Sequence, residues 1–193
     1  MFSVRVHGRG GQGVVTAAEL LSVAAFAEGR HAQAFPTFGS ERTGAPVVAF
    51  CRIDDRPIRL REPIVEPDAV IVQDPTLLHQ VPVFAGLGAG GFVLLNTARE
   101  PAALGIDDAL AALRADRVVA VPATELAREH VGRPLPNAAL LGAFAALTGV
   151  VGLAPVLQAI RDRFPGEVGE ANARAATAAH RFVHEHAERL TDA

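Results

Sequence analysis

The residues best suited to chemistry form a glycine turn near the start of the chain, in VHGRGGQGVV at residues 6–15. Gly8, Gly10 and Gly13 fit the G-x-G-x-x-G spacing, and Gly11 adds a fourth glycine. Between a strand and a helix, such glycines permit a tight turn and let backbone amides approach a phosphate at the positive end of the helix. The turn is compatible with an anion site and also with a close packing turn that holds no ligand.

A second copy of the spacing, GLGAGG at 86–91, follows an irregular segment with a proline and precedes an expected strand. We interpret it as a loop, because a phosphate-binding glycine turn must open a helix. For the first copy, a dinucleotide site also requires an acidic residue about 20 residues later, at the end of the second strand. That strand ends in QAF at 33–35, and the nearest carboxylates are Glu28 and Glu41. An ordinary NAD site is therefore disfavoured, whereas a site for another phosphate-bearing molecule stays open.

Other reactive residue types have simpler interpretations. Cys51 lies within an apolar strand, where a lone cysteine is typically a small buried hydrophobe. His180 and His184 have the i, i+4 spacing of a metal pair, but the charged residues around them favour a solvated helix face. Asn137 follows Pro136 and precedes an apolar helix, so it is interpreted as an N-cap, with a ligand contact left open. We expect no catalytic residue and no metal site in this chain.

Composition excludes several functions. All 18 basic residues are arginine, so neither a lysine Schiff base nor a phosphate-binding lysine is available. A single cysteine cannot hold an iron–sulfur cluster, which needs about four thiolates. The net charge of −3 and the lack of a long basic run argue against nucleic acid as a partner. No signal peptide or membrane span is recognisable, so we expect a cytoplasmic protein that does not contact a membrane.

The elements that position the glycine turn are expected in one α/β domain over residues 1–193, with a mostly parallel sheet covered by helices. A β-hairpin insertion is expected after the second strand, with a DDRP turn at 54–57 from which PIRL folds back, and the chain ends in a helical tail. Strands are predicted at 2–7, 30–35, 47–53, 68–74, 91–96 and 117–123, and helices at 13–28, 137–148, 153–163 and 167–189.

The connection FPTFGSERTGAP at 35–46 is too long for a simple turn and is expected near the carboxyl ends of the strands, where such sheets receive ligands and partners. Phe35 and Phe38 are expected to be buried against something, and a partner subunit is a good candidate. The alternative is an exposed loop with a weak Glu41–Arg42 ion pair.

Two blocks, GRGGQGVVTAAELL and AQAFPTFGSERTGAPVVAFCRI, resemble the gamma subunit of the pyruvate:ferredoxin oxidoreductase family, the thiamine-diphosphate-dependent 2-oxoacid:acceptor oxidoreductases. The resemblance continues in VIVQDPTLL at 70–78, in PNAALLGAFAALTGVV at 136–151 and in the closing FPGEVGEANARAATAAHRFV. It covers nearly the whole chain and implies a Rossmann-like fold.

The resemblance implies a role in a larger complex that oxidatively decarboxylates a 2-oxoacid, with pyruvate the expected substrate, and usually releases an acyl-CoA. Thiamine diphosphate, magnesium and iron–sulfur clusters would lie on alpha, beta and delta-type (ferredoxin-like) subunits, with ferredoxin or another acceptor taking the electrons. The gamma subunit would pack beside the thiamine subunits and has been associated with coenzyme A. Composition agrees, because the chain lacks cluster cysteines and a G-D-G segment for magnesium and diphosphate.

Carried over by position, the first block implies that turn amides receive a CoA phosphate, and the second block implies a subunit contact near the active-site entrance. Arg42 would pair with a carboxylate or phosphate, or form a salt bridge across the interface. The cofactor-contacting candidates are Gly8, Gly10, Gly11, Gln12, Gly13 and Thr16 in the first block, with Ser40 and Arg42 in the second.

Two other hypotheses remain open. The chain can be a stand-alone nucleotide- or CoA-binding regulatory module without catalytic partners, or a purely structural subunit that binds no ligand. Neither the 2-oxoacid nor the electron acceptor is specified by these residues, since 2-oxoglutarate, branched 2-oxoacids and aryl glyoxylates are also used by the family that the chain resembles.

Overall fold

The protein is built around a six-stranded sheet in the order β2-β3-β1-β4-β5-β6. The structure is a computed structural model that describes residues 1–37 and 44–191. Neighbouring strands are parallel from β1 through β4 and β5 to β6, whereas β3 is antiparallel to both β1 and β2. The strands are β1 Phe2–Arg9, β2 His31–Pro36, β3 Pro46–Asp54, β4 Ala69–Val72, β5 Phe92–Asn96 and β6 Val118–Val121.

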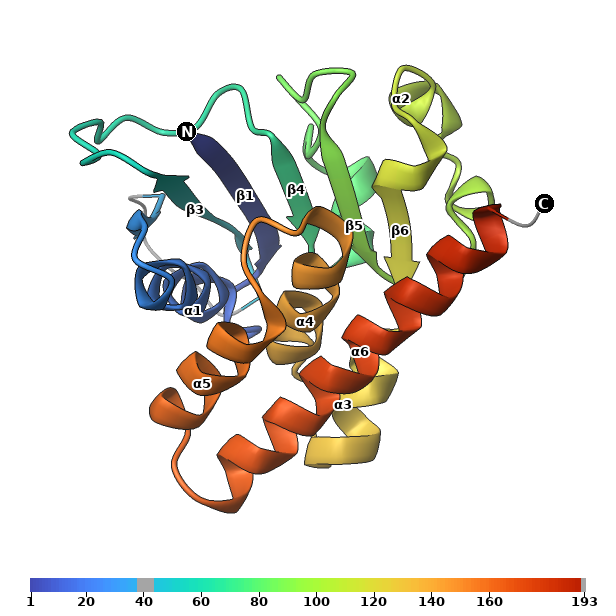
Figure 1. Cartoon of the computed structure of the whole chain (residues 1–193). Helices are drawn as coiled ribbons and strands as arrows, with labels where there is room; N and C mark the ends of the chain where they lie inside the picture. Colours follow the sequence, from blue (N-terminus) through green and yellow to red (C-terminus); the bar gives the residue numbers. More distant parts are fainter. Residues whose placement is uncertain (38–43, 192–193) are drawn as a thin grey trace.

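A layer of helices covers one face of this sheet, as Figure 1 shows for α1, α4, α5 and α6. Apolar side chains alternate along β1, so that Val4 and Val6 point into the core under these helices. Helix α4 is apolar on all sides and lies in the middle of the layer, packed against α6. The helices are α1 Val14–Ala27, α2 Asp107–Leu110, α3 Ala123–Val131, α4 Asn137–Thr148, α5 Leu153–Arg163 and α6 Glu167–Thr191.

The close approach of α4 and α6 depends on Gly142. A Cβ at this position would overlap the carbonyl oxygen of Ala176 on α6. Small residues at a crossing let two helix backbones come together, so α6 buries its alanine face against α4.

The opposite face of the sheet has a second, smaller hydrophobic cluster. Val70 and Val72 of β4 and Val93 and Leu95 of β5 pack there against Leu77 of a short 3-10 helix, η1 (Pro75–His79), and against connecting segments. Each face of the β4–β5 region therefore has its own core, as the near-continuous apolar runs predict.

The predicted fold class is confirmed: an α/β fold with a mostly parallel sheet, covering helices and a helical C-terminal tail. The predicted β-hairpin insertion after the second strand is wrong, because β3 forms its antiparallel pairs with β2 and β1 and not with a strand that follows it. The predicted return strand PIRL at 57–60 is wrong, because residues 55–68 contain no strand. Strand β3 already pairs with β1 on one side and with β2 on the other, so no edge is left for it. The helix α3 was not expected from the sequence. No helix among the described residues is long and apolar enough to cross a membrane.

Candidate functional site

The glycine turn lies between β1 and α1, as its sequence context predicts. β1 ends at Arg9, and α1 begins after Gly13, which has a left-handed φ of 72°. Gly11 also has a positive φ, of 92°, a conformation that costs little only for glycine. An open cavity of about 250 Å³ lies against the turn, lined by Arg9, Gly10, Gly11, Gly13, Val14, Val15, Thr16 and Val47.

Two glycines of the turn are required by close packing. A Cβ on Gly8 would lie 2.6 Å from Cγ2 of Val14, and one on Gly13 would lie 2.8 Å from Nδ2 of Asn137. Distances below 3.0 Å require movement of the neighbouring group. The glycines therefore hold β1, α1 and the start of α4 together. Packing accounts in this way for Gly8 and Gly13 but not for Gly11, where an added Cβ would meet no atom of a non-neighbouring residue within 4 Å.

The start of α4 differs from its prediction. The N-cap is Pro136, and Asn137 is the first helical residue. Its side chain is buried over Gly13 instead. The N-cap interpretation of Asn137 is therefore wrong. Pro136 takes the N-cap position, and the side-chain amide of Asn137 packs into the space over Gly13.

A polar network fixes the turn from the outside. The guanidinium of Arg9 donates to Oδ2 of Asp74 at 3.1 Å, to Oγ1 of Thr76 at 2.7 Å, to Oε1 of Gln80 at 2.8 Å and to the carbonyl of Gly44 at 3.0 Å. These partners come from the segment after β4 and from the residues just before β3, so Arg9 connects the carboxyl ends of the two central strands.

Gln12 completes this network from within the turn. Its Oε1 accepts from the backbone N–H of Arg9 at 2.7 Å, and its Nε2 donates to Oδ2 of Asp74 at 2.9 Å. Burial opposes the ionised form of Asp74, but hydrogen bonds from Thr76 and Gln12 and the charge of Arg9 outweigh it and hold the pKa of this carboxyl below its ordinary value. Asp74 is therefore an ionised anchor for the turn, and the role of Gln12 is to position the backbone.

The turn also contacts the second sequence block. The N–H of Gly10 donates to the carbonyl of Ala45 at 2.9 Å, and the N–H of Gly44 donates to the carbonyl of Gly10 at 3.2 Å. Ser40 and Arg42, predicted from the same block, lie outside the described residues, as do Phe38, Gly39 and Glu41. The structure thus brings the middle of this block, just before β3, to the glycine turn, at the edge of the sheet where the prediction located it.

The geometry next to β1 differs from that of a dinucleotide-binding sheet. There the second strand lies beside the first, and its last residue reaches the ribose. Here β3 lies between β1 and β2, and its first residue, Pro46, is paired with Arg9. The position from which an acidic residue would reach a ribose is therefore occupied by the start of an antiparallel strand.

Beneath the turn lies a set of buried amides that sequence reasoning missed. Nδ2 of Asn96 donates to the carbonyl of Gln73 at 2.7 Å and to Oγ1 of Thr124 at 2.8 Å, and its Oδ1 accepts from the N–H of Thr124. The side-chain amide of Gln73 is 1 % exposed, and neither its oxygen nor its nitrogen has a hydrogen-bond partner. Gln73 and Asn96 could have been identified from the sequence, because each lies at the carboxyl end of an expected strand.

A second open cavity, of about 560 Å³, lies on the other side of the Arg9 network. It is formed where β4 and β5 end, between η1 and the segment that follows β5. The lining residues are Pro75, Thr76, Leu78, His79, Thr97, Arg99, Ala103 and Leu104. Both cavities flank the point between β1 and β4 at which chain connections leave in opposite directions, which is where open α/β sheets bind ligands.

The remaining candidates are distant from this edge or inert. Cys51 is fully buried, and burial raises the pKa of its thiol to about 12, so its interpretation as a buried hydrophobe is confirmed. The ring centroids of His180 and His184 lie 4.5 Å apart on α6. Burial, and then the charge of His184, lower the pKa of His180. Within the described residues, no group of three or more His, Cys, Asp or Glu side chains can hold a metal ion. The glycines at 86–91 form a loop before β5, as predicted.

Comparison with known proteins identifies clear relatives. The family model for pyruvate ferredoxin/flavodoxin oxidoreductase matches residues 3–182. The common gamma subunit of the pyruvate/ketoisovalerate oxidoreductases of Pyrococcus furiosus is 50% identical over 182 residues, which are 93% of this chain and 96% of the relative. Pyruvate synthase subunit PorC of Methanocaldococcus jannaschii is 49% identical over 180 residues, again 93% of this chain and 96% of the relative.

Solved structures agree with this grouping. The pyruvate oxidoreductase subunit PORC of Thermotoga maritima superposes with a TM-score of 0.78 at 36% identity, covering 93% of this chain and 95% of that one. The same fold occurs in a longer chain, the 2-oxoglutarate:ferredoxin oxidoreductase of Magnetococcus marinus, with a TM-score of 0.67 at 17% identity. The match covers 93% of this chain but 31% of that one, so there the fold is one part of a larger polypeptide.

Proposed function

Since the chain belongs to the pyruvate ferredoxin/flavodoxin oxidoreductase family, as a gamma subunit, we propose that it works in a thiamine-diphosphate-dependent complex that oxidatively decarboxylates pyruvate to an acyl-CoA. Residues 1–193 act as one gamma-type domain that packs beside thiamine-bearing subunits. Thiamine diphosphate, magnesium and iron–sulfur clusters belong to alpha, beta and delta-type partners, and ferredoxin or another acceptor takes the electrons. When bound in a partner, thiamine diphosphate supplies the carbanion chemistry of decarboxylation.

The contribution of this chain is to hold coenzyme A at the glycine turn. The observation that carries this proposal is the open cavity against Gly10, Gly11, Gly13 and Thr16 at the start of α1. The first turn of α1 contains no acidic residue, and the first N–H groups of a helix have no partner within the helix. Such a helix end favours an anion, and a phosphate of CoA is the anion that the reaction supplies.

The fixed position of the turn supports this role. Arg9 and Gln12 are held by Asp74, and Gly8 and Gly13 lock the turn between neighbouring elements. Donors that are already in place lose little conformational entropy when a phosphate binds. Ser40 and Arg42 are proposed to extend the same site from the connection between β2 and β3, where the hydrogen-bonded pair Gly10 and Gly44 brings that connection to the turn.

The choice of 2-oxoacid is proposed to lie with the partner subunits. The Pyrococcus furiosus relative is, by its name, common to a pyruvate and a ketoisovalerate oxidoreductase. A gamma subunit shared in this way has to accept two 2-oxoacids, so it serves the part of the reaction that does not depend on the 2-oxoacid side chain. Coenzyme A binding is such a part.

Purification of the chain with a C-terminal tag from its own host tests the assembly. We expect it to bring down subunits that contain thiamine diphosphate and iron–sulfur clusters, and recovery of the chain alone would contradict the proposal. Calorimetric titration with CoA, NAD and adenine nucleotides separates the alternatives. Tight binding of NAD by a chain without partners would favour a stand-alone regulatory module, and assembly without heat from any ligand would favour a purely structural subunit.

A further inference from the structure

The second cavity at the carboxyl edge of the sheet differs in chemical character from the cavity at the glycine turn. We call it the β4–β5 cavity, after the strands at whose ends it opens. Its volume of about 560 Å³ lies within the range of about 300 to 1,000 Å³ that is usual for small-molecule sites. Its described lining is half apolar, with Pro75, Leu78, Ala103 and Leu104, and half polar, with Thr76, His79, Thr97 and Arg99. An apolar wall beside hydroxyl groups and a guanidinium suits a ligand that combines an aromatic ring, a sugar and an anionic group.

Arg99 supplies the charge of the β4–β5 cavity. Its side chain is exposed, and none of the hydrogen bonds and ion pairs found in the described part of the chain involves its guanidinium. The adjacent carboxylate, Glu100, lines two smaller cavities beside β6 and does not line this one. Asp74, which precedes the lining residue Pro75, is already bonded to Arg9 and Gln12. The described lining therefore has a free guanidinium and no carboxylate, so it favours an anion.

The glycine turn has no such cation among its described residues. Arg9 lines the cavity there, but its guanidinium is paired with Asp74 at 3.1 Å and also donates to Thr76, Gln80 and Gly44. The turn itself offers backbone amides at the start of a helix, which suit a diphosphate that lies close to the main chain. A terminal phosphate group is bound better by a guanidinium, which can donate two parallel hydrogen bonds to it.

The two cavities are separated by a single side chain. Arg9 lines the cavity at the turn, and its NH2 donates to Oγ1 of Thr76, which lines the β4–β5 cavity. Oγ1 of Thr76 in turn donates to Oδ1 of Asp74 at 2.6 Å, so this boundary is a fixed polar network. A ligand with anionic groups on both ends of one ribose matches the arrangement, because one group lies on each side of Arg9. Coenzyme A is such a ligand, since its ribose carries a 5′-diphosphate and a 3′-phosphate.

We propose that the β4–β5 cavity binds the 3′-phosphoadenosine part of coenzyme A, with Arg99 on the 3′-phosphate and the adenine ring against Leu78 and Leu104. The 5′-diphosphate of the same molecule lies at the glycine turn. This inference rests on the proposed function and goes beyond it by assigning a second site and the residue that recognises the 3′-phosphate. Nε2 of His79 lies 3.1 Å from the carbonyl oxygen of Leu104 and so connects η1 to η2 (Pro101–Leu104) across the cavity. Walls that are already connected lose little conformational entropy when the ligand binds.

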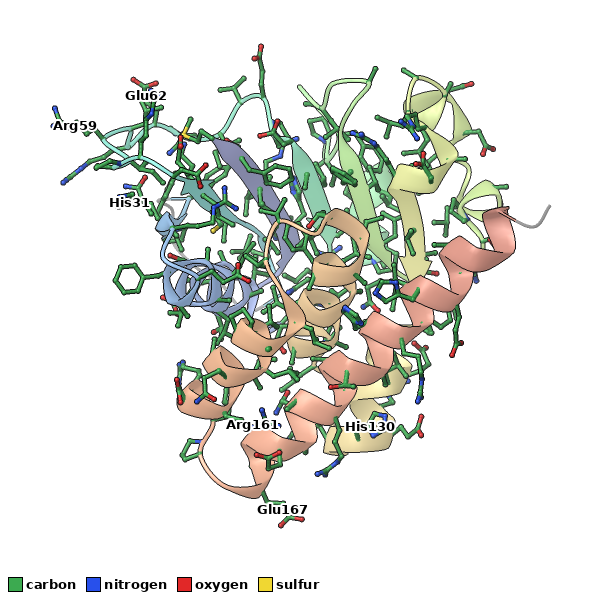
Figure 2. The ribbon with its side chains drawn as sticks, in the orientation of Figure 1. His31, Arg59, Glu62, His130, Arg161 and Glu167 are labelled. Carbon is green, nitrogen blue, oxygen red and sulfur yellow. The ribbon has the colours of Figure 1, made fainter. Side chains whose placement is uncertain are left out.

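The test measures the dissociation constants of CoA and of dephospho-CoA, which lacks the 3′-phosphate, by calorimetry on the purified complex without a 2-oxoacid. Arg99→Met removes the charge and keeps a long side chain, whereas Arg99→Lys keeps a charge without the paired donors. The matched control is Arg59→Met, since Arg59 is also exposed. Figure 2 shows Arg59 at the opposite end of the sheet from the carboxyl ends of β4 and β5. Thermal melting checks that each variant is folded.

We expect the wild-type complex to bind CoA about 10-fold more tightly than dephospho-CoA, which is typical of one charge-assisted contact in an open cavity. Arg99→Met should bind both ligands with the wild-type affinity for dephospho-CoA, because only the contact with the 3′-phosphate is lost. Arg99→Lys should retain part of the preference for CoA, and Arg59→Met should retain all of it.

Equal binding of CoA and dephospho-CoA by the wild type would overturn this inference, as would a preference for CoA that persists in Arg99→Met. An equal loss of affinity for both ligands, or a loss of partner subunits, in Arg99→Met would also overturn it, because Arg99 would then have a structural or an interface role. Thr16→Asp tests the proposed function separately, since its carboxylate lies beside the turn and should weaken the binding of both ligands. A complex that does not bind CoA, or that binds both ligands unchanged in Thr16→Asp, would refute CoA binding at the turn.

Discussion

Placing a carboxylate at the start of α1 should have opposite effects on stability and on ligand binding. Thr16 is the third residue of α1, is half-buried and lines the cavity at the glycine turn, and the first turn of the helix has no acid. In Thr16→Asp, the new charge complements the helix dipole, which contributes about 0.3 to 1 kcal/mol. For a protein of this size, this corresponds to a melting temperature higher by about 1 to 4 °C.

The same charge should repel a phosphate bound at the turn. At a separation of about 5 Å and an effective dielectric constant of about 40 to 80, the repulsion is about 0.8 to 1.7 kcal/mol per unit of phosphate charge. This corresponds to a rise in KM for CoA of about 4- to 17-fold for each unit of charge. The assay is 2-oxoacid-dependent reduction of the electron acceptor by the purified complex, measured as a function of CoA concentration.

Ala154→Asp provides the matched control for this experiment. Ala154 is exposed in the first turn of α5, which also lacks an acid, so the substitution has the same charge and a similar effect on a helix dipole. We expect this variant to gain stability without a change in KM for CoA. If Thr16→Asp raises the melting temperature and leaves KM for CoA equal to that of Ala154→Asp, no phosphate binds at the turn.

Three further predictions concern the packing and titration of the same region. Gly13→Ala should destabilise the protein by about 2 kcal/mol in chemical denaturation, because it adds a clash with Asn137 to the backbone strain at φ 72°. Gly29→Ala, at a φ of 80° with open space for the methyl group, should destabilise it by about 1 kcal/mol. Equal losses of stability in the two variants would refute the packing role of Gly13. Gln73→Met should be neutral or stabilising by about 1 kcal/mol, because it removes a buried amide without partners, and a marked loss of stability would show that the amide is bonded. Burial first and then the charge of Arg5 lower the pKa of His7 to about 4, so the unfolded chain binds more protons than the folded protein between about pH 4 and 6.5. The free energy of unfolding should therefore fall by about 2 kcal/mol from pH 7 to pH 5, and by less in His7→Gln, which keeps an acceptor for Arg5. An equal pH dependence of the unfolding free energy in the two proteins would contradict this assignment.

Much of the architecture was predictable because local signals and tertiary structure agree. The glycine turn has a short apolar strand before it and a periodic apolar segment after it, and these became β1 and α1. The same spacing at 86–91 lacks that context and forms a loop. Helices α4 and α5 begin and end at the predicted residues, since prolines and glycines mark both ends.

The remaining features depend on contacts between distant residues. PIRL at 57–60 forms no strand because β3 already lies between β1 and β2. The residues around PIRL contain no information about that strand order. The nine-residue helix α3 has three charged residues and a histidine, so its apolar signal is weak, and its burial against α6 is not visible in its own sequence.

The candidate site shows the same division. Glycines at the turn were found from their spacing, but Asp74 is 62 residues away from Gln12, and its role as the ionised anchor follows from the pairing of β1 with β4. The neighbours of Asn137 in the sequence predict a cap, whereas its side chain packs over Gly13, a residue in a distant part of the sequence. The spacing of the glycines therefore predicts where the turn lies, whereas the residues that fix its conformation follow only from tertiary contacts.

An experimental structure of the complete complex with CoA bound would show whether the glycine turn receives a phosphate of coenzyme A within a 2-oxoacid oxidoreductase. We expect a CoA phosphate within hydrogen-bonding distance of the backbone amides between Gly11 and Thr16, with thiamine-bearing subunits packed beside this chain. Coenzyme A bound elsewhere, with the turn closed by a partner side chain, would contradict it.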